Sequence, residues 1–143
     1  MATIGAARPV DARLTTVISR ITVVTLTLAT AAIHASLGGL LFLVNAVVYS
    51  SLALALVLPG PLGRFRWLIR LGLVGFTAAT IGGWVLFGAR YPLAYLDKAI
   101  EAALLVTLAV DIWHSDGGPI QVARRLRTLV AGLVRSLAAR AQP

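Results

Sequence analysis

Four apolar stretches of helix-spanning length dominate the sequence. A helix rises about 1.5 Å per residue, so roughly 20 apolar residues are needed to cross a hydrocarbon core of about 30 Å. The four stretches therefore predict four transmembrane helices, and no segment shows the pattern of a strand. We expect these helices at about 14–35, 39–58, 67–87 and 93–113.

Composition agrees with a chain whose solvent is largely lipid. Hydrophobic residues make up 59% of the sequence and charged residues only 13%, whereas a soluble domain has about 25% charged residues. Apolar character runs from Ile21 through Leu58, which is too long for the core of a secretory signal and suits two membrane passes. The predicted fold class is all-α, a four-transmembrane-helix bundle.

The basic residues predict the orientation of this bundle. Positive residues that flank short loops are retained in the cytoplasm. One side of the predicted bundle carries only Arg90, with Lys98 slightly inside the last helix. The opposite side carries eleven arginines: Arg8, Arg13, Arg20, Arg64, Arg66, Arg70, Arg124, Arg125, Arg127, Arg135 and Arg140. We therefore expect a multi-pass protein of the cell inner (plasma) membrane with a cytoplasmic N-terminal segment at 1–13 and a cytoplasmic C-terminus.

The tail at 119–141 predicts a basic amphipathic helix. Apolar residues recur there at helical spacing, and arginines occupy other positions. We interpret it as an interfacial helix on the inner leaflet, with its arginines near anionic lipid. The alternative is a cytosolic helix docked on a partner subunit. The arginines expected to meet lipid are Arg124, Arg125, Arg127, Arg135 and Arg140.

Charged residues inside the last apolar stretch mark a candidate polar site. Asp97 and Glu101 are four apart and share a helical face, and Lys98 can reach Glu101 from beside that face. By the helical rise, Glu101 lies about 10 Å below the outer boundary. Intramembrane charges are costly, so they usually face the bundle interior in pairs. Asp97 and Lys98 sit nearer the boundary, where water is an alternative partner.

Polar residues of the other helices fall at similar depth. Counted from their own outer ends, Thr30, Asn45 and Thr80 lie about 8 to 11 Å inside. His34 lies above this layer, and Tyr49 continues it toward the midplane. We predict an outward-opening polar pocket lined by His34, Asn45, Tyr49, Thr80, Asp97, Lys98 and Glu101. The alternative is structural, because such side chains often only bond helices together.

Several kinds of site are not indicated. The chain has no cysteine, which excludes disulfides and thiolate metal sites. His34 and His114 lie near opposite ends of the bundle and cannot share one haem. We predict no catalytic residues, no metal and no cofactor. The basic tail lacks the aromatic residues that stack on bases, so we expect no nucleic-acid partner.

Two segments carry a family resemblance. AIHASLGGLLFLVNAVVY and YLDKAIEAALL resemble a pattern found in small four-helix bacterial integral membrane proteins, through His34, Gly38, Asn45, Tyr49 and the Asp97–Glu101 segment. Such proteins lack an assigned activity, so the resemblance implies fold and location but no chemistry. The small multidrug transporters also have four helices and one buried glutamate. Theirs is in the first helix rather than the last, and we do not assign that family.

Three functional hypotheses follow. The first is an accessory or scaffold subunit that meets lipid, a membrane-protein partner or a second copy of itself through the glycine-lined stretch 67–87 and the basic tail. The second is a small transporter or proton-coupled carrier that uses the pocket around Glu101. A membrane enzyme comes third, because no reaction-specific set of residues is present.

Overall fold

The computed structural model describes residues 10–59 and 61–140, which form five α-helices joined by short connections. The described residues contain no strand, so the all-helical fold class is confirmed. Most of the expected segment 1–13 and the last residue of the predicted tail lie outside the described residues. The elements are α1 (Val10–Leu37), α2 (Leu40–Val57), the 3-10 helix η1 (Pro61–Phe65), α3 (Arg66–Phe87), α4 (Pro92–Asp116) and α5 (Pro119–Arg140).

Three of these segments are long and apolar enough to cross a membrane: 14–37, 40–57 and 63–87. They correspond to the first three predicted spans. Helix α4 has 25 residues, which is also sufficient length for a crossing. It differs from the other three because it carries five charged residues: Asp97, Lys98, Glu101, Asp111 and Asp116.

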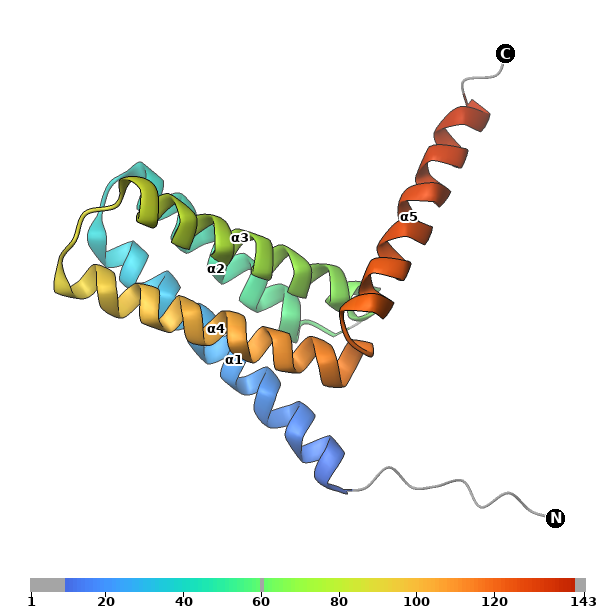
Figure 1. The fold of residues 1–143 in the computed structure, drawn as a ribbon, viewed down its shortest axis with the longest axis horizontal. Coiled ribbons are helices and arrows are strands. Elements are labelled where there is room, and N and C mark those ends of the chain that lie inside the picture. Colours follow the sequence, from blue (N-terminus) through green and yellow to red (C-terminus); the bar gives the residue numbers. More distant parts are fainter. Residues whose placement is uncertain (1–9, 60, 141–143) are drawn as a thin grey trace.

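The first four helices pack around a common core (Figure 1). Each one contacts the next along the chain, and α1 also packs against α4, so α2 and α4 lie diagonally opposite each other. Tyr49, Leu73, Leu104 and Leu108 are fully buried between them. Large apolar side chains, such as Leu41 on α2, remain exposed on the outside. A shell of this kind suits contact with lipid tails.

Two glycines make the turn between α1 and α2. Gly38 and Gly39 have φ angles of 69° and 83°, respectively, a backbone region that L side chains rarely adopt. Their pairing lets α2 reverse direction immediately after α1 ends at Leu37. The turn was predicted at Ser36–Gly39, so α1 extends slightly further than expected.

The ends of two helices differ from the sequence prediction. Helix α1 begins by Val10 rather than near Leu14, because a helix can continue past the apolar stretch on which the prediction relied. Helix α4 continues to Asp116 instead of ending near Trp113. It ends where Gly117 adopts a left-handed conformation with φ 79°, the usual way for a glycine to terminate a helix.

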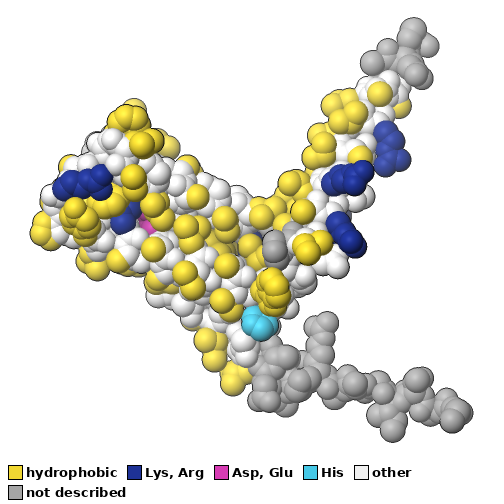
Figure 2. All heavy atoms as spheres, in the orientation of Figure 1, with side chains coloured by type: hydrophobic (Ala, Val, Ile, Leu, Met, Phe, Trp, Pro, Cys, Tyr) yellow, Lys and Arg dark blue, Asp and Glu magenta, His cyan; other side chains and the backbone are white. Residues whose placement is uncertain are grey.

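Helix α5 leaves the end of the bundle where α4 stops and projects away from it (Figure 1). Val122 is buried against the bundle, whereas all residues from 123 to 140 are exposed. Figure 2 shows apolar side chains along one side of α5 and basic side chains along the other. This two-sided helix agrees with the amphipathic pattern of the sequence.

Candidate functional site

The first half of α4 supplies three charged residues to the bundle interior. Pro92 occupies the first turn of α4, where a proline leaves no intrahelical hydrogen bond unmade. Asp97 and Glu101 then follow on one face, and they are 2% and 0% exposed, respectively. Both carboxylates are therefore buried inside the bundle, and the alternative in which water is the partner of Asp97 stays a prediction.

Lys98 neutralises part of this buried charge. Its Nζ lies 2.6 Å from Glu101 Oε2 and 2.9 Å from Asp97 Oδ2. A buried carboxylate needs such a partner because the loss of hydration costs several kcal/mol per ion. The predicted ion pair between Lys98 and Glu101 is thus present, and Lys98 holds both carboxylates at once.

The second oxygen of Glu101 is bound by α2 and α3. The Tyr49 hydroxyl on α2 donates to Glu101 Oε1 at 2.9 Å. The Thr80 hydroxyl on α3 lies 2.9 Å from the same oxygen and 2.9 Å from the Tyr49 hydroxyl. Glu101 therefore ties three helices together through one carboxylate.

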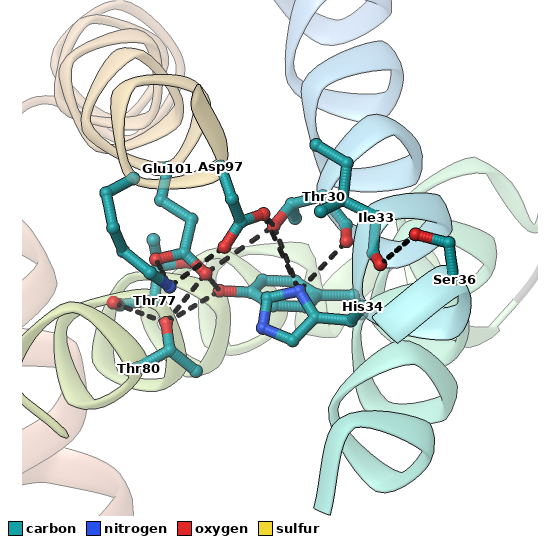
Figure 3. A network of polar contacts seen from close by, with 10 residues as sticks. Thr30, Ile33, His34, Ser36, Thr77, Thr80, Asp97 and Glu101 are labelled. Carbon is teal, nitrogen blue, oxygen red and sulfur yellow. Dashed lines mark hydrogen bonds and ion pairs between the residues drawn. The ribbon is translucent and has the colours of Figure 1, made fainter. Parts of the chain in front are cut away.

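Asp97 is bound from α1. The Thr30 hydroxyl donates to Asp97 Oδ1 at 2.6 Å. The ring of His34, one turn further along, donates from Nδ1 to the Thr30 carbonyl at 2.9 Å and lies 3.6 Å from Asp97 Oδ1. Figure 3 shows Asp97 and Glu101 pointing from α4 toward Thr30 and His34 on one side and Thr80 on the other. All four helices thus contribute to one polar network.

A cavity of about 610 Å³ adjoins this network. Its wall combines apolar and aromatic side chains, such as Phe42, Phe76 and Trp84, with a few polar groups. This mixture is typical of sites for small ligands, in which apolar walls give contact area and polar groups fix orientation. The polar residues on the wall are His34, Asn45, Thr80, Asp97 and Lys98.

The structure brings the predicted pocket residues close together and adds Thr30 to them, with two differences from the prediction. Thr30, His34, Tyr49, Thr80, Asp97, Lys98 and Glu101 form the connected network. Asn45 lies on the cavity wall, half-buried, at some remove from the ion pairs. Tyr49 and Glu101 form the floor beneath the cavity rather than its wall. Whether these residues bind a ligand stays a prediction.

A second buried charge cluster lies at the other end of the bundle. Arg70 on α3 is 4% exposed, and its guanidinium donates from Nε to Asp111 and from Nη1 to Asp116 at 3.0 Å. Ser19 on α1 also donates to Asp111, at 3.1 Å. Arg125 on α5 approaches Asp116 at 3.4 Å. Ser19 in the first half of α1, the start of α3, the end of α4 and the start of α5 therefore meet at one end of the bundle.

The sequence prediction treated Arg70 only as an orientation signal. The sequence could have predicted a structural ion pair, because Arg70 lies inside the apolar stretch 67–87 and Asp111 lies inside the stretch 93–113. Counting depth from the arginine-bearing ends would have placed the two side chains at a similar level. The predicted lipid-surface arginines on α5 are exposed: Arg124, Arg125, Arg127, Arg135 and Arg140.

Glycines of α3 do not bring two helices of this chain together. Open space surrounds the Cβ positions of Gly75 and Gly83, and Gly72 meets only a Leu52 methyl group at 3.9 Å. Ala79 and Gly83 instead line the cavity. The small residues therefore leave space beside α3 within this chain. A helix that packs closely against them would have to come from another molecule.

Comparisons with protein-family models, curated proteins and solved structures find no match to this chain. The resemblance to small four-helix bacterial membrane proteins accordingly stays a prediction, and the functional argument depends on the residues of the site.

Proposed function

We propose that the chain is a four-helix protein of the inner membrane, with α4 as the fourth span. The support comes from the direction in which the charges of α4 point. Asp97, Glu101 and Asp111 are buried and paired inside the bundle, whereas the outer face presents apolar residues such as Val106 and Val110. A membrane helix with inward, paired charges has no charged group to place in lipid.

The proposed orientation places both termini in the cytoplasm. Its support is the gathering of arginine-bearing ends at one end of the bundle, the end where Arg70, Asp111 and Asp116 also meet. The cavity then opens toward the outside. Reporter fusions at the N- and C-terminus test this directly: both must be active in the cytoplasm, and activity on opposite sides of the membrane contradicts the orientation.

Within this topology we propose a small transporter or proton-coupled carrier. The observation that carries the proposal is the cavity of about 610 Å³ whose wall includes Asp97 and Lys98, with the buried Glu101 bound to Lys98 at 2.6 Å. A scaffold protein needs no such cavity. Buried carboxylates in membrane helices are a recurrent feature of proton relays and substrate pathways.

The network suggests how the binding of a proton and the binding of a ligand are linked. Glu101 accepts bonds from Lys98, Tyr49 and Thr80 as a carboxylate. Protonation of Glu101 removes its charge and weakens the pair with Lys98, which keeps its bond to Asp97 and gains the capacity to bind a polar ligand on the cavity side. Binding of the ligand and binding of the proton are thereby coupled through one lysine.

The test compares wild-type and Glu101→Gln proteins in proteoliposomes that contain a trapped pH indicator. A panel of small anions and zwitterions, which the Lys98 ammonium can bind, is added outside under an inward proton gradient. We expect at least one compound to accelerate proton entry in wild type and none to do so in Glu101→Gln. Thr107→Val is the matched control on α4, because the Thr107 hydroxyl bonds only to its own helix, at Ala103. Equal responses of wild type and Glu101→Gln contradict the proposal.

An accessory subunit is the second candidate function. The observation that favours it is the unoccupied space at Gly75 of α3, together with the exposure of both sides of α5 from residue 123 onward. Both surfaces are suited to a neighbouring molecule. Purification in a mild detergent separates the two candidates, because a monomer that carries no other protein contradicts the accessory role.

A further inference from the structure

Three metal-ligating side chains meet at the base of the cavity. His34 on α1 and Asp97 and Glu101 on α4 each place one ligand atom within 4.8 Å of those of the other two. All three side chains are buried, with exposures of 3%, 2% and 0%. His34 and Asp97 also form part of the cavity wall. A cation in the cavity can therefore reach this cluster without crossing the apolar core.

The hydrogen bonds of His34 prepare its ring for a metal ion. A carbonyl oxygen can only accept, so the 2.9 Å contact between Nδ1 and the Thr30 carbonyl places the proton on Nδ1. The lone pair of the neutral ring is then on Nε2, whereas the 3.6 Å contact with Asp97 Oδ1 is made by Nδ1, so a metal ion must bind on the Nε2 side of the ring. Histidines that bind metals commonly donate their other ring N–H to a backbone carbonyl in this way, which fixes the tautomer and the ring orientation.

Each of the two carboxylates has one oxygen bound by Lys98 and one bound by hydroxyl groups. Lys98 binds Asp97 Oδ2 and Glu101 Oε2. The Thr30 hydroxyl lies 2.6 Å from Asp97 Oδ1, and the Tyr49 and Thr80 hydroxyls each lie 2.9 Å from Glu101 Oε1, so a metal ion on these two oxygens would replace neutral donors. Two carboxylates with one lysine leave a net negative charge at the cluster, which favours a cation.

We propose that His34, Asp97 and Glu101 bind one divalent transition-metal ion that enters through the cavity. One imidazole and two carboxylates, without sulfur, suit Zn²⁺, Mn²⁺ or Fe²⁺ better than Cu⁺, and the imidazole disfavours Mg²⁺ and Ca²⁺. Ligands of a tetrahedral zinc ion lie roughly 3.4 Å apart, since each bond is about 2.1 Å. The ligand atoms of the present cluster lie within 4.8 Å of one another, so metal binding requires them to move closer together. The inference goes beyond the proposed carrier, because it requires binding but no transport.

Lys98 acts as an internal competitor for this ion. Its ammonium lies within 3 Å of both carboxylates, at 2.9 and 2.6 Å, and neutralises the charge that would otherwise attract the metal. Removing the ammonium therefore strengthens metal binding, whereas removing any of the three ligands weakens it. These opposite effects distinguish a metal site from a purely structural network, in which every substitution acts in the same direction.

Tag-free protein in detergent provides the test, by equilibrium dialysis against Zn²⁺ and by the visible absorption of bound Co²⁺. We expect one ion per chain with a dissociation constant of about 10 μM or less. His34→Gln and Glu101→Gln weaken binding by at least about 100-fold, and Lys98→Gln strengthens it several-fold. The matched control is His114→Ala, since His114 is exposed and is the second of the two histidines. It leaves binding unchanged.

A wild-type dissociation constant above about 10 μM overturns the inference. Metal binding that survives His34→Gln, or that is lost in His114→Ala, also overturns it. Weaker binding in Lys98→Gln, measured on a variant with the wild-type helical circular dichroism, also overturns it. None of these results bears on the proton-coupled carrier, because dialysis involves no gradient and no flux. Failure of the metal site and failure of the proposed function are thereby separable.

Discussion

The hydroxyl of Tyr49 on α2 donates a 2.9 Å hydrogen bond to Glu101 on α4, across the diagonal of the helix arrangement. Both side chains are 0% exposed. The bond therefore joins two helices that do not neighbour each other, at the level where α1 and α3 also contribute polar groups. It makes Tyr49 a structural support of the carboxylate that the proposed mechanism uses.

Tyr49→Phe should destabilise the bundle by about 1–3 kcal/mol, because it leaves a buried carboxylate with one donor fewer. The measurement is the free energy of unfolding in mixed detergent micelles. Tyr95→Phe is the matched control, since Tyr95 is 53% exposed and its ring contact with Trp84 needs no hydroxyl. Equal stability of Tyr49→Phe and wild type would mean that the diagonal bond contributes nothing.

Arg70→Met should lower the free energy of unfolding by about 3–5 kcal/mol, because Asp111 and Asp116 would lose their shared guanidinium while remaining buried. Arg70→Lys should restore little of this loss, since one ammonium cannot reproduce the fork that holds two separate carboxylates. Unfolding in micelles again gives the values. Arg64→Met, at an exposed position, controls for the loss of a positive charge, and a similar cost there would contradict the account.

Gly38→Ala should destabilise the protein by about 1 kcal/mol, since φ 69° places the new Cβ in an unfavourable backbone region. Gly75→Ala provides the comparison within a helix, where open space surrounds the new Cβ. It should be neutral or stabilising by up to about 1 kcal/mol. Thermal unfolding of the two variants in one detergent measures both effects, and the same sign for both would contradict the assignment of the turn.

An environment-sensitive fluorophore on Leu133→Cys should show a blue-shifted emission in nanodiscs that contain anionic lipid, because the apolar face of α5 enters the headgroup boundary. The same probe on Thr128→Cys, on the opposite face, should remain hydrated. Nanodiscs of zwitterionic lipid should reduce the shift at Leu133. Equal emission from both positions would indicate that α5 does not lie on the membrane surface.

Much of the fold could be predicted because the sequence has the long apolar stretches that membrane-spanning helices require. Each apolar stretch must form a helix of spanning length, so the positions of α1 to α4 follow from where Gly38, Pro59, Gly88 and Gly117 interrupt the hydrophobic pattern. The ends were harder to predict. Helix α1 begins at Val10 and helix α4 ends at Asp116, both beyond the apolar stretches, so hydrophobicity does not reveal these ends. The last turn of α4 is held by the contact between Asp116 and Arg70.

The polar layer was predictable by depth, whereas its pairing was not. Counting helical rise placed Thr30, Thr80 and Glu101 at a common level, and the structure connects them. The same arithmetic gave no rotation about the helix axis. Asn45 lines the cavity as a pocket residue should, whereas Tyr49 and Glu101, which were also predicted to line the pocket, are not on its wall. The proximity of His34 to the carboxylates of α4 could not be predicted, because it results from the packing of α1 against α4 and no local sequence pattern encodes that packing.

Labelling of Ala79→Cys in intact cells with a membrane-impermeant maleimide tests most directly whether the cavity opens outward across a four-span bundle. Ala79 lines the cavity, and the chain has no cysteine of its own. Val106→Cys on the apolar exterior and Thr128→Cys on α5 serve as lipid-facing and cytoplasmic controls. The account predicts labelling of Ala79→Cys alone in intact cells. Labelling of Ala79→Cys only after the membrane is permeabilised, together with Thr128→Cys, would contradict it.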